Sequence, residues 1–182
     1  MRNKSYRVCG IILKRVNIGE ADKILTVFTR ERGKIVCLAK GIRKICSRRA
    51  PALEPFNKIS AQMVKGKNID LVAEVEVIKS FPDVKKNLFQ VGWAYYIAEL
   101  VDKLTAQEQE NLPIYQLFES TLVKIQNEGV VNQELIIGFQ KNLLLNLGFG
   151  LPDSITKDSL RWYIETIVSR KLASQLFINK IE

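Results

Sequence analysis

The sequence of 182 residues contains no histidine, the side chain that serves most often as a general base and as a metal ligand. Catalytic dyads and triads that depend on histidine are therefore excluded. The chain also lacks the phosphate-binding pattern G-x-x-x-x-G-K-[ST] and the dinucleotide-binding pattern G-x-G-x-x-G. We find no constellation for catalysis, and we expect neither an enzyme nor a bound cofactor.

Cysteine is also scarce, and the spacing of Cys9, Cys37 and Cys46 argues against a disulfide framework and against a tetrahedral zinc site. Such usage fits a reducing cytosol. No apolar run approaches the roughly 18 residues of a membrane span, and the first residues contain no apolar signal core. We therefore expect a cytoplasmic protein that neither spans a membrane nor is secreted.

Charge is plentiful but unevenly distributed. Residues 1–80 contain 18 Lys and Arg against 7 Asp and Glu, a net charge of +11, whereas residues 81–182 contain 10 against 12, a net charge of −2. Five of the cations lie within Lys40–Arg49. A basic domain joined to a near-neutral one is typical of a polyanion binder, although excess lysine can also serve solubility alone.

Short apolar runs separated by turn residues indicate β-strands in the first 80 residues. Five runs fit this pattern: Tyr6–Val16, Lys23–Thr29, Ile35–Gly41, Phe56–Gly66 and Ile69–Phe81. The short gaps between runs indicate an antiparallel meander. One face of the fifth strand is expected to be apolar and to contain Leu71, Ala73, Val75 and Val77. Five strands with one long loop favour a small closed barrel, for which the OB-fold is the commonest candidate.

From Asp83 onward the apolar residues recur at helical spacing. Four stripes predict helices within Phe89–Leu104, Ile114–Ile125, Leu135–Leu147 and Leu160–Val168. We interpret Trp93 and Trp162 as core residues of these helices. The predicted architecture is α+β, with an N-terminal five-stranded OB-fold β-barrel at residues 1–81 and an all-α helical domain at residues 82–182.

Cations near the ends of the predicted strands are the main candidates for a function. A groove lined by such side chains would bind phosphates with little sequence preference. The candidate contacts to a nucleic-acid backbone are Lys14, Arg15, Arg30, Lys34, Lys40, Arg43, Lys44, Arg48 and Arg49. Tyr6 is the better candidate for stacking on a base, whereas Phe28 is assigned to the core. Glu20 and Asp22 are interpreted as partners in loop-ordering ion pairs rather than as metal ligands.

Several motifs together carry a family resemblance. They are "GEAD" (Gly19–Asp22), "LTVFTRERGK" (Leu25–Lys34), "AKGIRK" (Ala39–Lys44) and "SRRAPALEPF" (Ser47–Phe56). With them, Gly10–Lys44 closely resembles the start of the bacterial recombination mediator family RecO. Ala94–Thr105 and Asn142–Pro152 resemble the helical half of that family, and Arg161–Phe177 resembles its last helix.

The resemblance implies an OB-fold followed by a helical domain, in a nucleoid-associated protein that binds single- and double-stranded DNA. It further implies annealing of complementary strands and, with RecR, help in loading the RecA recombinase onto strands coated by single-strand-binding protein. The family recognises the acidic tail of that protein through its helical half. Lys124 and Lys141 are candidates for binding the carboxylates of the tail, or they are ordinary solvated lysines.

One departure from the family concerns zinc. Many members carry a four-cysteine zinc module after the segment that corresponds to "LGFGLP" (Leu147–Pro152), whereas here Asp153–Leu160 leads almost directly into the last helix. We expect a shortened member without a bound metal. Two other functions stay open from the residues alone: an OB-fold RNA-binding or ribosome-associated protein, and an adaptor whose basic loop binds acidic protein partners.

Overall fold

The computed structural model describes residues 4–128, 131–169 and 172–178. The chain divides into two compact units. The first comprises the described residues up to Ser80 together with Ala106–Leu112, and the second comprises Phe81–Thr105 and the described residues from Pro113 onward.

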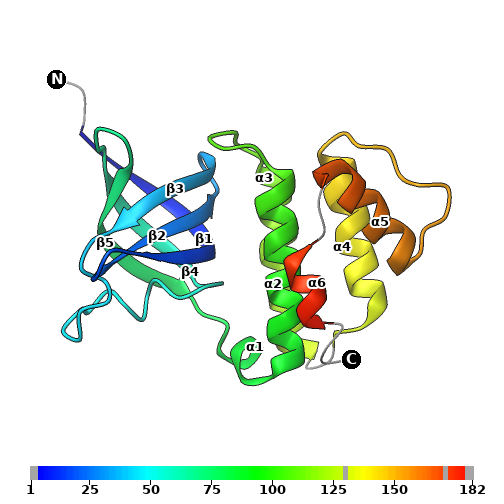
Figure 1. Cartoon of the computed structure of the whole chain (residues 1–182), viewed down its shortest axis with the longest axis horizontal. Helices are drawn as coiled ribbons and strands as arrows, with labels where there is room; N and C mark the ends of the chain where they lie inside the picture. The colour runs from blue at the N-terminus through cyan, green and yellow to red at the C-terminus, as the bar shows by residue number, and fades with distance from the viewer. Residues whose placement is uncertain (1–3, 129–130, 170–171, 179–182) are drawn as a thin grey trace. The chain divides into compact units, whose positions relative to one another are not determined.

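The first unit is a closed five-stranded barrel (Figure 1). Its strands are β1 (Ser5–Ile18), β2 (Asp22–Thr29), β3 (Gly33–Ala39), β4 (Lys58–Val64) and β5 (Asp70–Lys79). The strands follow the order β1-β2-β3-β5-β4, and β4 pairs with β1 to close the barrel. The five-stranded barrel expected from the sequence is thus confirmed. The meander expectation holds for β1 to β3, but β3 and β5 are parallel, which makes the barrel mixed.

The long segment between β3 and β4 contributes to the core of the barrel. Ile42 and Leu53 of this segment are buried and belong to the same apolar cluster as Ile12, Leu25 and Ile59 of the strands. Burial of two apolar side chains attaches the segment to the barrel, although its sequence is mostly polar. This attachment restricts the position of the chain between Ile42 and Leu53, which carries the cations Arg43, Lys44, Arg48 and Arg49.

The apolar face predicted for β5 is confirmed for Val75 but is wrong for Ala73 and Val77, which are exposed. Met63 of β4 pairs with Val72, whereas the preceding Gln62 pairs with Glu74, so Ala73 is an extra residue in β5. A β-bulge of this kind shifts the alternation of side chains by one position. As a result Val72 and Val75 face the core, and Ala73 is exposed.

The second unit is helical, and all four predicted helices are present. The described helices are α1 (Pro82–Lys86), α2 (Leu88–Leu104), α3 (Leu112–Glu128), α4 (Gln133–Asn146), α5 (Lys157–Val168) and α6 (Ala173–Ile178). Polar caps define where three of them begin, because the side chains of Asn87, Asn132 and Thr156 accept hydrogen bonds from the first-turn amides of α2, α4 and α5. Helix α2 packs against α1, α4 and α6.

Two expectations for the last helices are corrected. Arg161–Phe177 is not one helix, because α5 ends at Val168 and Ser169 has a left-handed φ of 56° before α6 begins at Ala173. Trp93 is buried as expected, but Trp162 is 68% exposed. The buried residues of α5 are Leu160 and Ile164, so a residue midway between them faces the opposite side of the helix.

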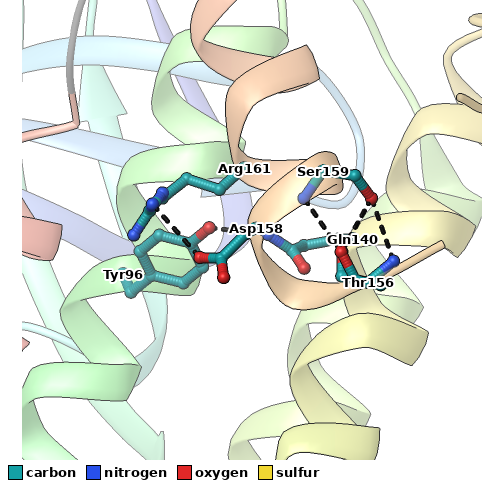
Figure 2. A network of polar contacts seen from close by, with 6 residues as sticks. All are labelled: Tyr96, Gln140, Thr156, Asp158, Ser159 and Arg161. Carbon is teal, nitrogen blue, oxygen red and sulfur yellow. Dashed lines mark hydrogen bonds and ion pairs between the residues drawn. The ribbon is translucent and has the colours of Figure 1, made fainter. Parts of the chain in front are cut away.

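A polar pair links two helices inside this unit (Figure 2). The Nε2 of Gln140 on α4 donates a hydrogen bond of 2.6 Å to the hydroxyl of Tyr96 on α2, and both residues are buried. Burial raises the pKa of Tyr96 above its ordinary value. Nearby, Thr156 and Ser159 form the capping box that begins α5. Within the described part of the chain, no helix is both long and apolar enough to cross a membrane.

Candidate nucleic-acid interface

The segment Lys40–Arg49, called the basic loop from here on, is held against the β1–β2 turn by three hydrogen bonds. The amide of Gly41 donates to the Asp22 carboxylate at 2.7 Å, and the amide of Arg43 donates to the carbonyl of Ala21 at 2.9 Å. The Arg43 guanidinium donates to the carbonyl of Gly19 at 3.2 Å. Asp22 therefore orders the loop by accepting a backbone N–H, whereas an ion pair was expected for its carboxylate. The left-handed φ of 66° at Gly41 gives the chain its direction out of β3.

Arg49 holds the other end of the basic loop. Its Nη1 donates to the carbonyls of Val72 at 2.7 Å and Ala73 at 3.2 Å, and its Nη2 donates to the carbonyl of Lys40 at 2.7 Å. The planar guanidinium suits three acceptors, of which two lie on β5 and one lies at the start of the basic loop. Its geometry indicates a structural function for Arg49, which the sequence had placed among the phosphate contacts.

The nine predicted phosphate contacts divide into six exposed residues and three that are buried or partly buried, of which Arg49 is one. Six are exposed: Lys14, Arg30, Lys40, Arg43, Lys44 and Arg48. Arg15 is partly buried and pairs with the Glu54 carboxylate, and Lys34 is buried at 8% exposure. Among the described residues, the side chains of Lys40, Lys44 and Arg48 have no acidic partner within ion-pair distance. These three therefore present charge that no carboxylate in the described part of the chain neutralises.

Lys23 is a further cation at this end of the barrel, and it was not among the nine predicted phosphate contacts. Partial burial lowers the pKa of its ammonium, and the neighbouring charges of Arg15 and Arg43 lower it further. Lys23 pairs with Asn17 across β1 and β2, so it lies diagonally opposite Arg15 on the same face. The register of β1 and β2 places Lys23 on the same face as Arg15, and a register shifted by one residue would place it on the other face.

The opposite end of β1 carries a different kind of surface. There a polar groove of about 480 Å³ is lined by residues that include Tyr6, Asp70 and Glu108. The Tyr6 hydroxyl donates to Asp70 at 2.5 Å, and the Arg32 guanidinium lies 4.6 Å from the centre of the Tyr6 ring. Burial, followed by the bond to Asp70, raises the pKa of Tyr6. Two carboxylates oppose phosphate binding in this groove, and the ring proposed for stacking already has a cation on one face.

The three thiols do not fit the four-cysteine zinc module known in the family that the sequence resembles. Cys9 lies on β1, Cys37 is in the core of the barrel and Cys46 is exposed in the basic loop. Among the described residues, no three His, Cys, Asp or Glu side chains are grouped to hold a metal ion. In the second unit, Lys124 of α3 is exposed and Lys141 of α4 is partly exposed.

A closed barrel of five strands with a parallel β3–β5 pair, followed by helices, defines the class of OB-fold proteins with an appended helical unit. Comparison with protein families gives the particular family. The model described as "Recombination protein O N terminal" matches residues 1–81, and "Recombination protein O C terminal" matches residues 85–153. The chain belongs to this family, the RecO family of DNA repair and recombination proteins.

Curated relatives agree with the family models. Proteins named "DNA repair protein RecO" are 35% identical over 119 residues in Pelotomaculum thermopropionicum, 33% over 144 residues in Symbiobacterium thermophilum and 35% over 159 residues in Desulforamulus reducens. These alignments cover 65%, 79% and 86% of this chain, and 46%, 57% and 60% of the respective relatives. The chain therefore spans about half the length of the curated relatives it matches.

Proposed function

We propose that this chain binds single- and double-stranded DNA through the exposed cations of the basic loop and anneals complementary strands as a recombination mediator. The main support is that Lys40, Lys44 and Arg48 are exposed on a loop that is hydrogen-bonded to the barrel, and that no acidic side chain among the described residues pairs with them. Cations held in this way contact phosphate without first losing an internal ion pair.

Annealing needs no chemical step in this proposal. A cationic surface lowers the repulsion between two phosphate backbones, and base pairing then provides the driving force. Family membership supports cooperation with RecR in loading RecA onto strands coated by single-strand-binding protein. Lys124 and Lys141 are retained as candidate contacts for the acidic tail of that protein, in a cytoplasmic, nucleoid-associated setting.

The test is fluorescence anisotropy of a labelled single strand, measured over a series of salt concentrations. The test variant replaces Lys40, Lys44 and Arg48 together with Ala. Each lost phosphate contact on a single strand reduces the log–log salt slope by about 0.7, so we expect the slope to flatten by about 2. Strand annealing should slow in the same variant, because the surface then screens less phosphate charge.

A control variant removes the same number of charges at the other end of β1. It replaces Lys4, Lys65 and Lys67 with Ala, all exposed and all in the first unit. Equal losses from the two variants would show that net charge alone drives binding and would refute the assignment to the basic loop. A competitor RNA that displaces DNA at far lower concentration would instead favour an RNA-binding function.

A further inference from the structure

Ile45 is an apolar residue at the tip of the basic loop, and its side chain is fully exposed. Its exposed fraction is 108% of the reference value for an accessible isoleucine, compared with 68% for Trp162 and 55% for Val16. Exposed apolar residues are common on protein surfaces when they are scattered. Ile45 differs because it lies between cations proposed to contact phosphate.

The structure of the loop explains why Ile45 projects outward. Hydrogen bonds from Arg43 to Gly19 and from Arg49 to Val72 hold the two sides of the tip. Between them, the amide of Lys44 donates to the carbonyl of Gly41, and the amide of Ser47 donates to the carbonyl of Lys44. These tight turns form the tip of the loop, where Lys44, Ile45 and Cys46 are all exposed.

The same segment places another isoleucine in the opposite environment. Ile42 is 4% exposed and packs in the barrel core, three residues before Ile45. Ile42 thus contributes to the core, whereas the side chain of Ile45 is not buried against any described residue. An apolar side chain held in water by a bonded loop is placed to be buried against a ligand.

We propose that Ile45 is an apolar wedge that contacts the bases of a bound single strand while the flanking cations hold its phosphates. The proposal rests on the proposed function of the basic loop. Lys44 and Arg48 flank the wedge and would position the backbone. Apolar side chains that proteins insert between base steps have to unstack the bases, and this costs least where the bases are already unpaired.

Two consequences separate a base contact from a phosphate contact. A base contact releases no counterions, so its loss weakens binding equally at every salt concentration and leaves the salt slope unchanged. It also favours single strands over duplexes, since the bases of a duplex are stacked and paired. Phosphate contacts alone provide neither effect.

The test compares Ile45→Ala with Ile155→Ala, a matched control in which the isoleucine is 41% exposed in the second unit. The probes are a labelled oligo-dT strand, a strand of the same length made of abasic sites, and a duplex. We expect Ile45→Ala to bind oligo-dT about three- to tenfold more weakly at every salt concentration, from partial loss of the burial of its side chain. Binding to the abasic strand and the duplex should stay within about twofold of wild type, since neither offers an unstacked base.

The outcomes are distinguishable from a failure of the proposed function. Lys44→Ala should flatten the salt slope by about 0.7 on both the oligo-dT and the abasic strand. If Lys44→Ala weakens binding and Ile45→Ala does not, or if Ile45→Ala weakens binding to the abasic strand equally, the wedge is refuted while the basic loop stands. If wild type binds none of the probes, the proposed function and the wedge are both refuted.

Discussion

Neighbouring arginines at the end of the basic loop should behave in opposite ways when mutated to lysine. Arg49 donates three hydrogen bonds to carbonyl oxygens, whereas Arg48 is exposed. Lysine keeps the positive charge but cannot reach three separated acceptors with a planar fork. The pair of variants therefore changes geometry at a constant net charge.

The magnitude follows from the environment of the three bonds. The bond from Arg49 to Val72 is partly buried, and those to Ala73 and Lys40 are exposed. A hydrogen bond from a charged donor contributes about 1.5–3 kcal/mol when shielded, and exposed bonds contribute less. We expect Arg49→Lys to lower the free energy of unfolding by about 2 kcal/mol, which is roughly 4–8 °C in Tm for a chain of this size.

Thermal unfolding followed by circular dichroism measures the effect, with salt-dependent DNA binding measured on the same samples. Arg48→Lys should leave Tm unchanged, and Arg48→Ala should flatten the salt slope by about 0.7 without a change in Tm. The reasoning is refuted if Arg49→Lys unfolds at the same temperature as Arg48→Lys. The hydrogen bonds of Arg49 would then contribute nothing measurable to stability, and Arg49 would again be a candidate phosphate contact.

Three further predictions concern stability. Gly33→Ala should lower the free energy of unfolding by more than about 3 kcal/mol, because φ is 63° and the new Cβ would lie 1.8 Å from the carbonyl oxygen of Gln109. Gly19→Ala is the control: φ is 54° but the space around the Cβ is open, so the loss should be about 1–2 kcal/mol. Chemical denaturation measures both losses. Tyr96→Phe leaves the buried Gln140 amide without its acceptor and should lower the free energy of unfolding by about 1–3 kcal/mol. In a double-mutant cycle with Gln140→Leu, the two losses should be less than additive. Burial raises the pKa of the Cys37 thiol from 9.0 to about 12, so the folded state holds this proton more tightly than the unfolded chain. The contribution of this thiol to the free energy of unfolding should therefore be fully present below about pH 9 and should be lost as the pH rises toward 12. Over the same pH range, the Tm of Cys37→Ala should fall less steeply than the Tm of wild type.

Much of the fold can be predicted from local pattern. Apolar runs bounded by turn residues located all five strands, and apolar stripes located the four longest helices. The parallel pairing of β3 with β5 was not predictable in this way, since it depends on contacts between segments far apart in sequence. Trp162 was misassigned because one side of α5 is buried and the side that carries the indole is not.

The candidate site could be predicted as a region but not residue by residue. Composition identified the basic loop, because five cations in ten residues need no tertiary information to be noticed. Composition does not distinguish a cation that faces solvent from one that is engaged within the fold. Lys34 is buried, Arg15 is paired with Glu54, and only the register of β1 and β2 brings Lys23 beside Arg15.

The shifted side chains of β5 and the hydrogen bonds of Arg49 have a common physical cause. The extra residue Ala73 disrupts the β4–β5 ladder, and pairing of β5 with β3 extends no further than Leu71. Carbonyl groups at such a point need other donors, and Arg49 donates to those of Val72 and Ala73. The bulge that shifts the side chains of β5 thus also creates the acceptors that hold the basic loop. Restoring regular pairing by deleting Ala73 should release the loop even with Arg49 intact, and it should lower DNA affinity without removing a single positive charge.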